Sequence, residues 1–588
     1  MKSERMRLFF VIFIILLYSL LPNLCFSNPT ISKNNNEKIN EIKLFISGSI
    51  LDPHKEPLRE AEIKLLINGK PHKIIVDHKE KDFTLTSSHG TYQIEALIPS
   101  EVIEKGKIEL EVFKTNFKKA IIELKKDEFG YKGNTFYIAK DIILERHLAP
   151  SFYIATIVFI IIYALIAFEL LHRTIAALIG AAIMLILTYT LGTIHPEYHI
   201  ISFERAMEAI DLNVIFLLMG MMIIIGVLKH TGVFQWCAYM SYKIARGNVF
   251  FLNVISCIFI AVTSAFLDNV TTMLLYTPVL IEIAVALRIS PFALLLPGIM
   301  ASNVGGTATL IGDPPNIMIG SYTGLTFMEF VKNLSLVCLI SMIALVIYNQ
   351  FFYGKDYKKG KVDDVEGFIA KLKEEYKITD KTLLTYGLLI MLLVVSFFIT
   401  HGYWHMEVSI PALFGASLLF TYGVVTKRVN MFELIEKDIE WSTLLFFIFL
   451  FILVGAVEEV GLLAIIADWV YHLSKGSLLI AITLIIWVAA IMSAFVDNIP
   501  FTATMLPIVA YLSKVIPGAE SNVLWWALAF GACFGGNGTM IGASANVVTV
   551  GILESAGYRI TFLGFMKYAF LYMIITVLIA NIWLLIFY

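Results

Sequence analysis

From Phe152 to the end of the chain, apolar runs of membrane-spanning length follow one another with few interruptions. Several of them reach the ~20 residues that an α-helix needs to cross the hydrocarbon core of a bilayer. The chain has 588 residues, of which 58% are hydrophobic and 16% are charged, whereas a soluble domain is about half apolar and about a quarter charged. The excess apolar surface must face lipid, so the sequence predicts an α-helical polytopic membrane protein.

The apolar segments form two sets on either side of a charged connector at residues 353–382. The first set is expected at 152–170, 173–192, 210–229, 249–267, 269–286, 291–322 and 327–352. The second set is expected at 383–400, 407–425, 440–458, 477–496, 498–515, 522–550 and 562–588. The connector is rich in lysine, which places it in the cytoplasm by the positive-inside rule. The membrane part therefore divides into two halves, residues 150–352 and 383–588.

The N-terminal part of the chain differs in character. Residues 1–28 combine basic residues with an apolar stretch, as in a signal peptide or a first transmembrane helix that is not cleaved. Residues 30–148 alternate polar and apolar side chains in short runs, which predicts an extracytoplasmic antiparallel β-sandwich of about seven strands. The stretch "SHGTYQIEALIP" resembles immunoglobulin-like domains of the carboxypeptidase-regulatory type. A structural or partner-binding role is expected for this domain.

The composition argues against several classes of protein. The net charge is −2 and no basic stripe carries interleaved aromatic residues, so no nucleic-acid partner is expected. No HExxH, GxSxG or Walker sequence is found, so we predict a protein that is neither an enzyme nor an ATPase. An ATPase partner on a separate chain stays open, and no cofactor is expected. The five cysteines lack CxxC spacing and are interpreted as apolar fillers; they are Cys25, Cys237, Cys257, Cys338 and Cys533.

Polar stretches interrupt the apolar segments in matched pairs. The pairs are "SAFLDNVTTMLLYTP" at 264–278 with "SAFVDNIPFTATMLP" at 493–507, "GGTATLIGDPPN" at 305–316 with "GGNGTMIGASAN" at 535–546, and "TIAALIGA" from Thr174 with "SIPALFGA" from Ser409. The members of each pair lie at nearly the same spacing along the two halves. Several matches in register are improbable by chance, so the chain contains a duplicated unit.

The two copies are expected to run in opposite directions through the membrane. If each Asp-Asn stretch is the tip of a re-entrant hairpin, each half crosses the bilayer an odd number of times. The charge pattern agrees, because the exported segment places residue 152 outside and the connector lies inside. Inverted repeats with broken, polar-tipped segments are typical of secondary transporters, with sites near the bilayer midplane. The predicted fold is an inverted repeat with two re-entrant hairpins and two broken helices.

The two hairpin tips carry carboxylate, amide and hydroxyl oxygens in apolar surroundings. Such hard ligands suit a small cation such as sodium, or a proton on the carboxylate. A charged aspartate at the bilayer centre costs about 2.5–3.5 kcal/mol, and an ion-filled cavity would offset that cost. The candidate ion-binding residues are Asp268, Asn269, Thr271 and Thr272 at the first tip, and Asp497, Asn498, Thr502 and Thr504 at the second. The candidate sodium ligands are Asp268, Asn269, Asp497 and Asn498. The alternative is that each aspartate only caps a helix.

The glycine-rich stretches are predicted to interrupt two membrane helices. Gly305 and Gly306 would permit an unwound backbone, and the prolines after Asp313 prevent the helix from continuing unbroken. The candidate site residues are Asn303, Gly305, Gly306, Thr307, Thr309, Asp313 and Asn316, with Gly535, Gly536, Asn537, Thr539, Ser544 and Asn546 in the second copy. Ala543 stands where the first copy has Asp313, so the two halves are not chemically equivalent. The alternative for each glycine pair is close packing between helices.

Other polar residues of the membrane part are assigned no ligand role. Glu458 and Glu459 fall at the end of an apolar segment and are interpreted as a solvated face. His172 and His230 are interpreted as interfacial. The short turn that contains His172 and Arg173 is expected on the cytoplasmic side, together with the connector.

The Asp-Asn and glycine-rich stretches together resemble the ion transporter superfamily, which contains arsenite pumps, NhaD-type antiporters and the citrate and dicarboxylate carriers. The versions "DNVTT" and "GDPPN" are most similar to the melanocyte P protein and its bacterial relatives, over residues 150–588. The resemblance implies a dimeric secondary transporter whose transport domain moves against a scaffold, an elevator mechanism. It also implies that the tip residues Asp268, Asn269, Thr271, Asp497 and Asn498 handle ions. In the citrate-type carriers the corresponding tip resembles Ser-Asn-Thr. This chain has Asp-Asn there, and the added negative charge of the aspartate disfavours a di- or tricarboxylate substrate.

We therefore expect a secondary active ion transporter, a sodium- or proton-coupled symporter or antiporter, in the bacterial inner or plasma membrane. Its expected partners are the lipid bilayer, an inorganic ion or small anion, and a second copy of the chain. Two alternatives stay open. One is an anion transporter for arsenite, antimonite, chloride or a carboxylate, with the aspartates protonated in transit. The other is a sensor or scaffold that acts through the exported domain.

Overall fold

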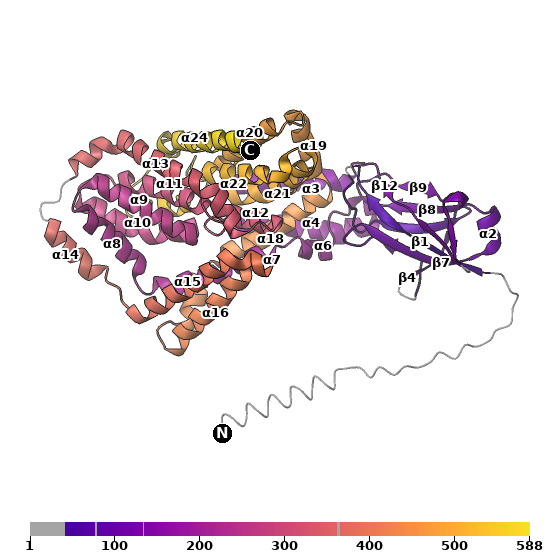
Figure 1. Cartoon of the computed structure of the whole chain (residues 1–588), viewed down its shortest axis with the longest axis horizontal. Helices are drawn as coiled ribbons and strands as arrows, with labels where there is room; N and C mark the ends of the chain where they lie inside the picture. Colours follow the sequence, from indigo (N-terminus) through magenta and orange to yellow (C-terminus); the bar gives the residue numbers. More distant parts are fainter. Residues whose placement is uncertain (1–40, 54, 77–78, 133–134, 361–364) are drawn as a thin grey trace, which may run out of the picture. The chain divides into compact units, whose positions relative to one another are not determined.

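The computed structural model describes residues 41–588 apart from residues 54, 77–78, 133–134 and 361–364 (Figure 1). The predicted signal peptide or first helix at 1–28, with Cys25, lies outside the described residues. The chain divides into two compact units. The first ends at Glu145, and the second is formed by Thr115–Phe117 together with Arg146–Tyr588. The first unit is built mainly of β-strands and the second of α-helices.

The N-terminal unit contains two sheets. One has seven strands in the order β10-β11-β1-β7-β4-β5, with β12 also paired to β1, and the other has five in the order β3-β2-β8-β9, with β6 on β2. The strands of the first sheet are β1 (Glu41–Leu51), β4 (Ile74–Val76), β5 (Lys79–Lys81), β7 (Thr91–Pro99), β10 (Gly130–Lys132), β11 (Thr135–Ala139) and β12 (Ile142–Ile143). Those of the second are β2 (Glu62–Ile67), β3 (Lys70–His72), β6 (Thr84–Leu85), β8 (Ile108–Phe113) and β9 (Ala120–Glu123). A short helix, α2 (Ser100–Lys105), follows β7.

This β unit differs from the prediction in the number of strands and in their direction. Strands β11 and β12 run parallel to β1, whereas β7 runs antiparallel to it. Polar–apolar alternation identifies the buried face of a strand but carries no information on the direction of its neighbour. Between β11 and β12, the Asp141 carboxylate accepts from Ser49 N at 2.8 Å and from Ser49 Oγ at 2.6 Å. These hydrogen bonds favour the charged form and hold the pKa of Asp141 below its usual value.

The helical unit contains two sets of helices. The first set is α3 (Pro150–Ala167), α4 (Arg173–Tyr189), α5 (Leu191–Ile194), α6 (Phe203–Glu208), α7 (Leu212–Lys229), α8 (Val233–Ala245), α9 (Val249–Phe266), α10 (Asn269–Ala286), α11 (Phe292–Thr307), α12 (Pro314–Thr323) and α13 (Phe327–Lys359). The second is α14 (Val365–Glu375), α15 (Lys381–Trp404), α16 (Ser409–Val425), α17 (Met431–Glu433), α18 (Trp441–Glu459), α19 (Leu462–Ser474), α20 (Leu478–Val496), α21 (Asn498–Val515), α22 (Val523–Gly535), α23 (Ser544–Ser555) and α24 (Phe562–Phe587). Among the described residues, ten helices are long and apolar enough to cross a membrane. The fold is a helical polytopic membrane fold, as the apolar runs predict.

The two sets share one order of elements. Helices α9 and α10 meet at Asp268, and α20 and α21 meet at Asp497. Residues 308–313 separate α11 from α12, and residues 536–543 separate α22 from α23. Helix α9 packs along α11, as seen in Figure 1, and α20 packs along α22 in the same way. Other contacts join the two sets, with α7 against α16 and α4 against α18.

The connector is partly helical, which its charge pattern does not indicate. Helix α13 continues to Lys359, beyond the expected end at residue 352, and α14 lies wholly within the connector. An apolar run marks where a helix meets lipid, and charged residues can extend the same helix into water. Glu282 of α10 accepts from Lys371 Nζ of α14 at 3.2 Å and from Tyr376 Oη. The connector is therefore attached to the end of α10 that lies away from Asp268.

Gly305 and Gly306 do not unwind their helix, so that expectation is wrong for the first pair, whereas Gly535 ends α22 and Gly536 begins the second break. Gly305 and Gly306 belong to α11, which continues to Thr307, and the break comes after them. A Cβ placed on Gly305 would lie 2.2 Å from the carbonyl oxygen of Ala261 in α9. A Cβ on Gly535 would lie 2.5 Å from the carbonyl oxygen of Ala490 in α20. The alternative interpretation, close packing between helices, explains both pairs.

We expect Gly305→Ala to push α9 and α11 apart and to destabilise the protein by about 1–3 kcal/mol, the usual cost of overpacking a filled interior. The matched control is Gly551→Ala in α23, because a Cβ there meets nothing within 4 Å. Thermal unfolding of the purified protein in detergent measures both variants. Equal melting temperatures for Gly305→Ala and the unsubstituted protein would contradict the packing explanation.

Candidate functional site

Asp268 and Asp497 each stand at the junction of two helices and cap the second one. Asp268 Oδ1 accepts from Thr271 N at 2.8 Å, and its Oδ2 accepts from Thr271 Oγ1 at 2.7 Å. Asp497 Oδ1 accepts from Ile499 N at 3.1 Å. Capping satisfies backbone N–H groups that the first turn of a helix leaves without partners. The capping interpretation therefore describes part of what both carboxylates do.

The asparagine of each tip donates to a third carboxylate, Asp313. Asn269 Nδ2 lies 3.4 Å from Asp313 Oδ1, and Asn498 Nδ2 lies 3.1 Å from the same oxygen. Asp313 is the residue that immediately precedes α12, and it is fully buried. The structure thus brings the two tips and the first helix break to one carboxylate.

Asn303 of α11 connects the first tip to the second helix break. Its Oδ1 accepts from Asn269 Nδ2 at 3.1 Å. Its Nδ2 donates to Asn537 Oδ1 at 3.0 Å and to Asn546 Oδ1 at 3.2 Å. An amide can donate and accept at once, which lets one side chain join several elements. We call the following buried residues the central cluster: Asn269, Asn303, Asp313, Asn498, Asn537 and Asn546.

Two asparagines at matched positions hold the interrupted backbone in place. Asn316 Nδ2 donates to the carbonyl oxygens of Thr307 and Thr309 at 2.9 and 2.8 Å. Asn546 Nδ2 does the same for two carbonyl oxygens of the second break, both at 2.7 Å. Carbonyl groups freed by a broken helix must find partners inside the protein, because lipid supplies none. These two predicted site residues therefore support the loops.

Most of the predicted threonines form hydrogen bonds within the protein through their hydroxyl groups. Thr309 Oγ1 donates to the Ala265 carbonyl at 2.5 Å, and Thr539 Oγ1 donates to the Ala494 carbonyl, so each break is tied to the neighbouring hairpin. Three others bond to a carbonyl one turn earlier in their own helix: Thr307, Thr502 and Thr504. Their hydroxyl groups are committed to the fold.

Three residues of the predicted site hold a buried polar atom that has no hydrogen-bond partner among the described residues. These atoms are Asp313 Oδ2, Asn537 Nδ2 and Thr272 Oγ1. Buried polar atoms in native proteins are nearly always paired, so an unpaired one at a cluster of this kind points to a functional role. Two of the three residues belong to the central cluster.

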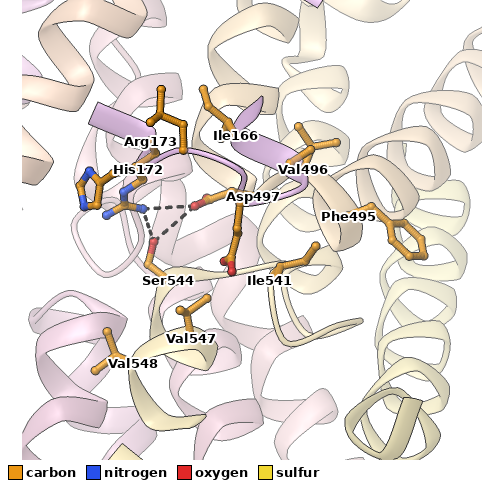
Figure 2. A pocket seen from close by; sticks show the side chains of 13 residues that line it. Ile166, His172, Arg173, Phe495, Val496, Asp497, Ile541, Ser544, Val547 and Val548 are labelled. Atoms are coloured by element: carbon orange, nitrogen blue, oxygen red, sulfur yellow. Dashed lines mark hydrogen bonds and ion pairs between the residues drawn. The ribbon is translucent and has the colours of Figure 1, made fainter. Parts of the chain in front are cut away.

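Arg173, which the sequence analysis did not single out, contacts the second tip. Its Nη1 lies 3.2 Å from Asp497 Oδ2 and 2.5 Å from Ser544 Oγ, and its Nη2 lies 3.2 Å from Thr443 Oγ1. The guanidinium carbon lies 5.1 Å from the centre of the Phe446 ring. Figure 2 shows the arginine side chain directed at Asp497 and Ser544 from the start of α4.

Positive residues beside apolar segments usually mark the cytoplasmic side. Arg173 was interpreted in that way, and its contact with Asp497 was therefore not predicted. One signal in the sequence could have revealed it. Arg173 is the first residue of α4, and a cation in the first turn of a helix is disfavoured by the helix dipole. Such an arginine needs an acidic partner elsewhere in the fold.

Glu440, which precedes α18, is another acidic group that the sequence analysis did not select. Its Oε2 accepts from Thr443 Oγ1 at 3.0 Å. The charged groups that act on its carboxylate are Asp268, which repels it, and Arg173 and Lys229, which attract it. Thr443 therefore contacts both Glu440 and Arg173, and Arg173 in turn pairs with Asp497 of the second tip.

The side chains of Glu458 and Glu459 are 39% and 17% exposed, and both also form ion pairs. Arg205 of α6 lies 3.4 Å from Glu458 Oε2 and 3.6 Å from Glu459 Oε2. His230 Nε2 lies 3.0 Å from Asp438 Oδ2, whose side chain is almost fully buried. Sequence position at a helix end does not reveal which oppositely charged residue the fold brings alongside.

Comparison with known proteins identifies transporters. The model of the citrate transporter family, CitMHS, matches residues 163–531. The "Uncharacterized transporter Rv2684" of Mycobacterium tuberculosis is 39% identical over 433 residues, which cover 73% of this chain and 97% of that protein. The P protein of Homo sapiens is 33% identical over 508 residues, which cover 74% of this chain and 59% of P protein. Among solved structures, the YdaH transporter of Alcanivorax borkumensis matches with a TM-score of 0.46 and 14% identity over 70% of this chain and 98% of that one.

The cap at Asp268 leads to a prediction that separates its structural role from its charge. Asparagine is as good an N-cap as aspartate, whereas alanine at an N-cap costs about 1 kcal/mol. We expect Asp268→Ala to lower the thermal unfolding temperature and Asp268→Asn to leave it nearly unchanged. If both variants unfold at the same lower temperature, the negative charge rather than the cap stabilises the start of α10.

Proposed function

This chain belongs to the citrate transporter family, CitMHS, and we propose that it is a secondary active transporter whose coupling cation, sodium or a proton, binds at Asp313. The chain is a membrane transporter and not an enzyme. The proposal assigns the coupling step to the central cluster, where the hairpin tips and the helix breaks meet. Asp268 and Asp497 act beside it as the acidic residues of the two tips.

The surroundings of Asp313 are the observation that carries this proposal. Its Oδ1 accepts from two amides, its Oδ2 has no hydrogen-bond partner within the geometric limits among the described residues, with the Cys533 thiol nearby, and its side chain is fully buried. None of the described lysine, arginine or histidine side chains is within ion-pair distance of it. A buried carboxylate without a positive partner is stable only when it is protonated or binds a cation. Two amide donors are too weak to replace a full positive charge.

The oxygen atoms near Asp313 support a cation site. Asn303 Oδ1 and Asp313 Oδ1 both accept from Asn269 Nδ2, so a carbonyl and a carboxylate oxygen flank the same amide. Neutral amide and anionic carboxylate oxygens are the ligands that a hard cation prefers. A proton would need the Asp313 carboxylate alone. Sodium would draw on the oxygens of the central cluster as well.

We further propose that the two halves are inverted and that each Asp-Asn tip belongs to a re-entrant hairpin. The attachment of Glu282 to the cytoplasmic connector supports entry of α9 and α10 from the cytoplasmic side. Thr115 directly follows Lys114 of the N-terminal unit, which is expected outside, and its Oγ1 donates to the Pro196 carbonyl at 3.3 Å. Arg205, a little further along the chain than Pro196, pairs with Glu458 at the end of α18, shortly before α19. These contacts support entry of α20 and α21 from the opposite side. Dimer formation and an elevator motion are part of the same proposal.

The test is transport by the purified chain in liposomes, with sodium and proton gradients imposed separately. We expect Asp313→Asn to reduce cation-driven flux by about tenfold or more, because an amide neither titrates nor carries the charge that holds a cation. Asp268→Asn and Asp497→Asn should also reduce it. The control is Asp468→Asn on α19, whose side chain is 43% exposed and pairs only weakly with His472. Its flux should equal that of the unsubstituted chain.

The outcome that contradicts the proposal is a folded Asp313→Asn protein with undiminished, gradient-dependent flux. Folding is checked by thermal unfolding and gel filtration of each variant before reconstitution. Loss of flux in the Asp468→Asn control as well would show that the effect is not specific to the central cluster, and would equally count against the assignment.

A further inference from the structure

A cavity of about 500 Å³ opens beside the second tip. It is lined by the end of α3, the turn before α4, the tip itself and the first turns of α23, as Figure 2 shows. Its size lies within the range of small-molecule sites. The ionisable residues of its lining are Glu169, His172, Arg173 and Asp497.

Within this cavity Arg173 already binds an oxyanion, namely the carboxylate of Asp497. The guanidinium donates to Asp497 Oδ2 and to Ser544 Oγ, and Ser544 Oγ lies 3.4 Å from the same Asp497 oxygen. A planar guanidinium with a hydroxyl beside it matches the geometry of carboxylates and inorganic oxyanions. The Asp497 backbone is strained, with φ 74° and ψ 140°, a conformation that persists only where the surroundings impose it.

The N-terminus of α23 adds partial positive charge to this cavity. The residue before the helix is Ala543, and no side chain caps the helix. The first N–H groups of a helix of this length favour an anion. In the first half the corresponding residue is Asp313, which supplies its own negative charge in front of α12.

The two halves also differ on the scaffold side. The alignment of Thr174 with Ser409 places Val408 at the position of Arg173. The first tip therefore faces no arginine from the matched turn, and its acidic neighbour is Glu440. Glu440 belongs to the second half and Arg173 to the first, so each half supplies the charged neighbour of the other half's tip, a carboxylate at the first tip and a guanidinium at the second. This asymmetry suits a protein that handles a cation at one tip and an anion at the other.

We propose that Arg173, with Ser544, forms the binding site for one oxyanion, and that Asp497 occupies this site as an internal substitute until it is neutralised. Binding of a proton or sodium ion to Asp497 removes its charge and releases the guanidinium. A dissolved carboxylate or inorganic oxyanion then takes its place in the cavity. The anion and the cation would bind together, so the direct consequence is symport. The coupling of anion to cation rests on the proposed function. Binding of the anion at Arg173 does not, because it needs no ion gradient.

The test measures equilibrium binding of radiolabelled citrate, succinate, phosphate, sulfate and chloride, each alone, to the purified full-length chain. Asp497→Asn imitates the neutral aspartate with a side chain of the same size. We expect this variant to bind an oxyanion about tenfold more tightly than the unsubstituted chain, because the internal competitor has lost its charge. Arg173→Gln should abolish binding both alone and combined with Asp497→Asn.

Three further variants keep the test decisive. Arg173→Lys retains the positive charge and should fold normally, but it should bind the oxyanion about tenfold more weakly, since lysine cannot donate as a fork. The matched control is the Arg428–Asp380 ion pair at the connector. Arg428→Gln and Asp380→Asn should leave anion binding unchanged.

The possible results separate cleanly. Arg173-dependent binding of citrate or succinate identifies a carboxylate, and Arg173-dependent binding of phosphate or sulfate identifies an inorganic oxyanion. Binding that is equal in Arg173→Gln, binding of chloride alone, or no binding to Asp497→Asn would overturn the inference. Arg173-dependent binding without cation-driven flux would refute only the proposed coupling. Cation-driven flux that needs Asp313 but no anion binding would refute only the assignment of Arg173.

Discussion

Every polar group inside the membrane part must find its partner within the protein, because lipid offers none. Two interrupted helices and two hairpin tips create many such groups in one place. Asn316 and Asn546 satisfy carbonyl oxygens of the breaks, and Asn303 joins the first tip to the second break. The same amides that hold the loops together thus surround Asp313, a buried carboxylate that forms no ion pair with any described lysine, arginine or histidine.

The two sets of helices share the same close packing, and they differ in the charged residues near the two tips. Matched glycines allow α9 to approach α11 and α20 to approach α22, so both copies are built on the same close contact. Asp313 has no acidic counterpart at Ala543, and Arg173 has no basic counterpart at Val408. A symmetric frame with asymmetric charges can place a cation and an anion close to each other without making the two sites equivalent.

Much of this architecture could be predicted from the sequence, because its signals are local. Apolar length predicts helices that face lipid, and the repeated Asp-Asn and glycine-rich stretches predict which segments belong together. Two interpretations of single residues were less successful. Gly305 was expected to unwind a helix and instead permits contact with Ala261, and a lone glycine pair is compatible with either outcome. Glu458 was expected to face water, and its side chain is 39% exposed, but the sequence did not indicate its ion pair with Arg205, a residue far away in the chain.

The sequence by itself determined that the chain is a polytopic membrane protein with an N-terminal β unit, and it predicted a duplicated core. It did so because hydrophobic length, alternation and repetition are properties of neighbouring residues. Only the tertiary structure decided which carboxylate lies at the centre and which arginine reaches the second tip. Asp268, Asp313 and Asp497 look alike in an apolar stretch, and their different roles depend on partners hundreds of residues away. Arg173 and Asp497 meet through packing between α3, α4 and the second hairpin, and no local pattern encodes that contact.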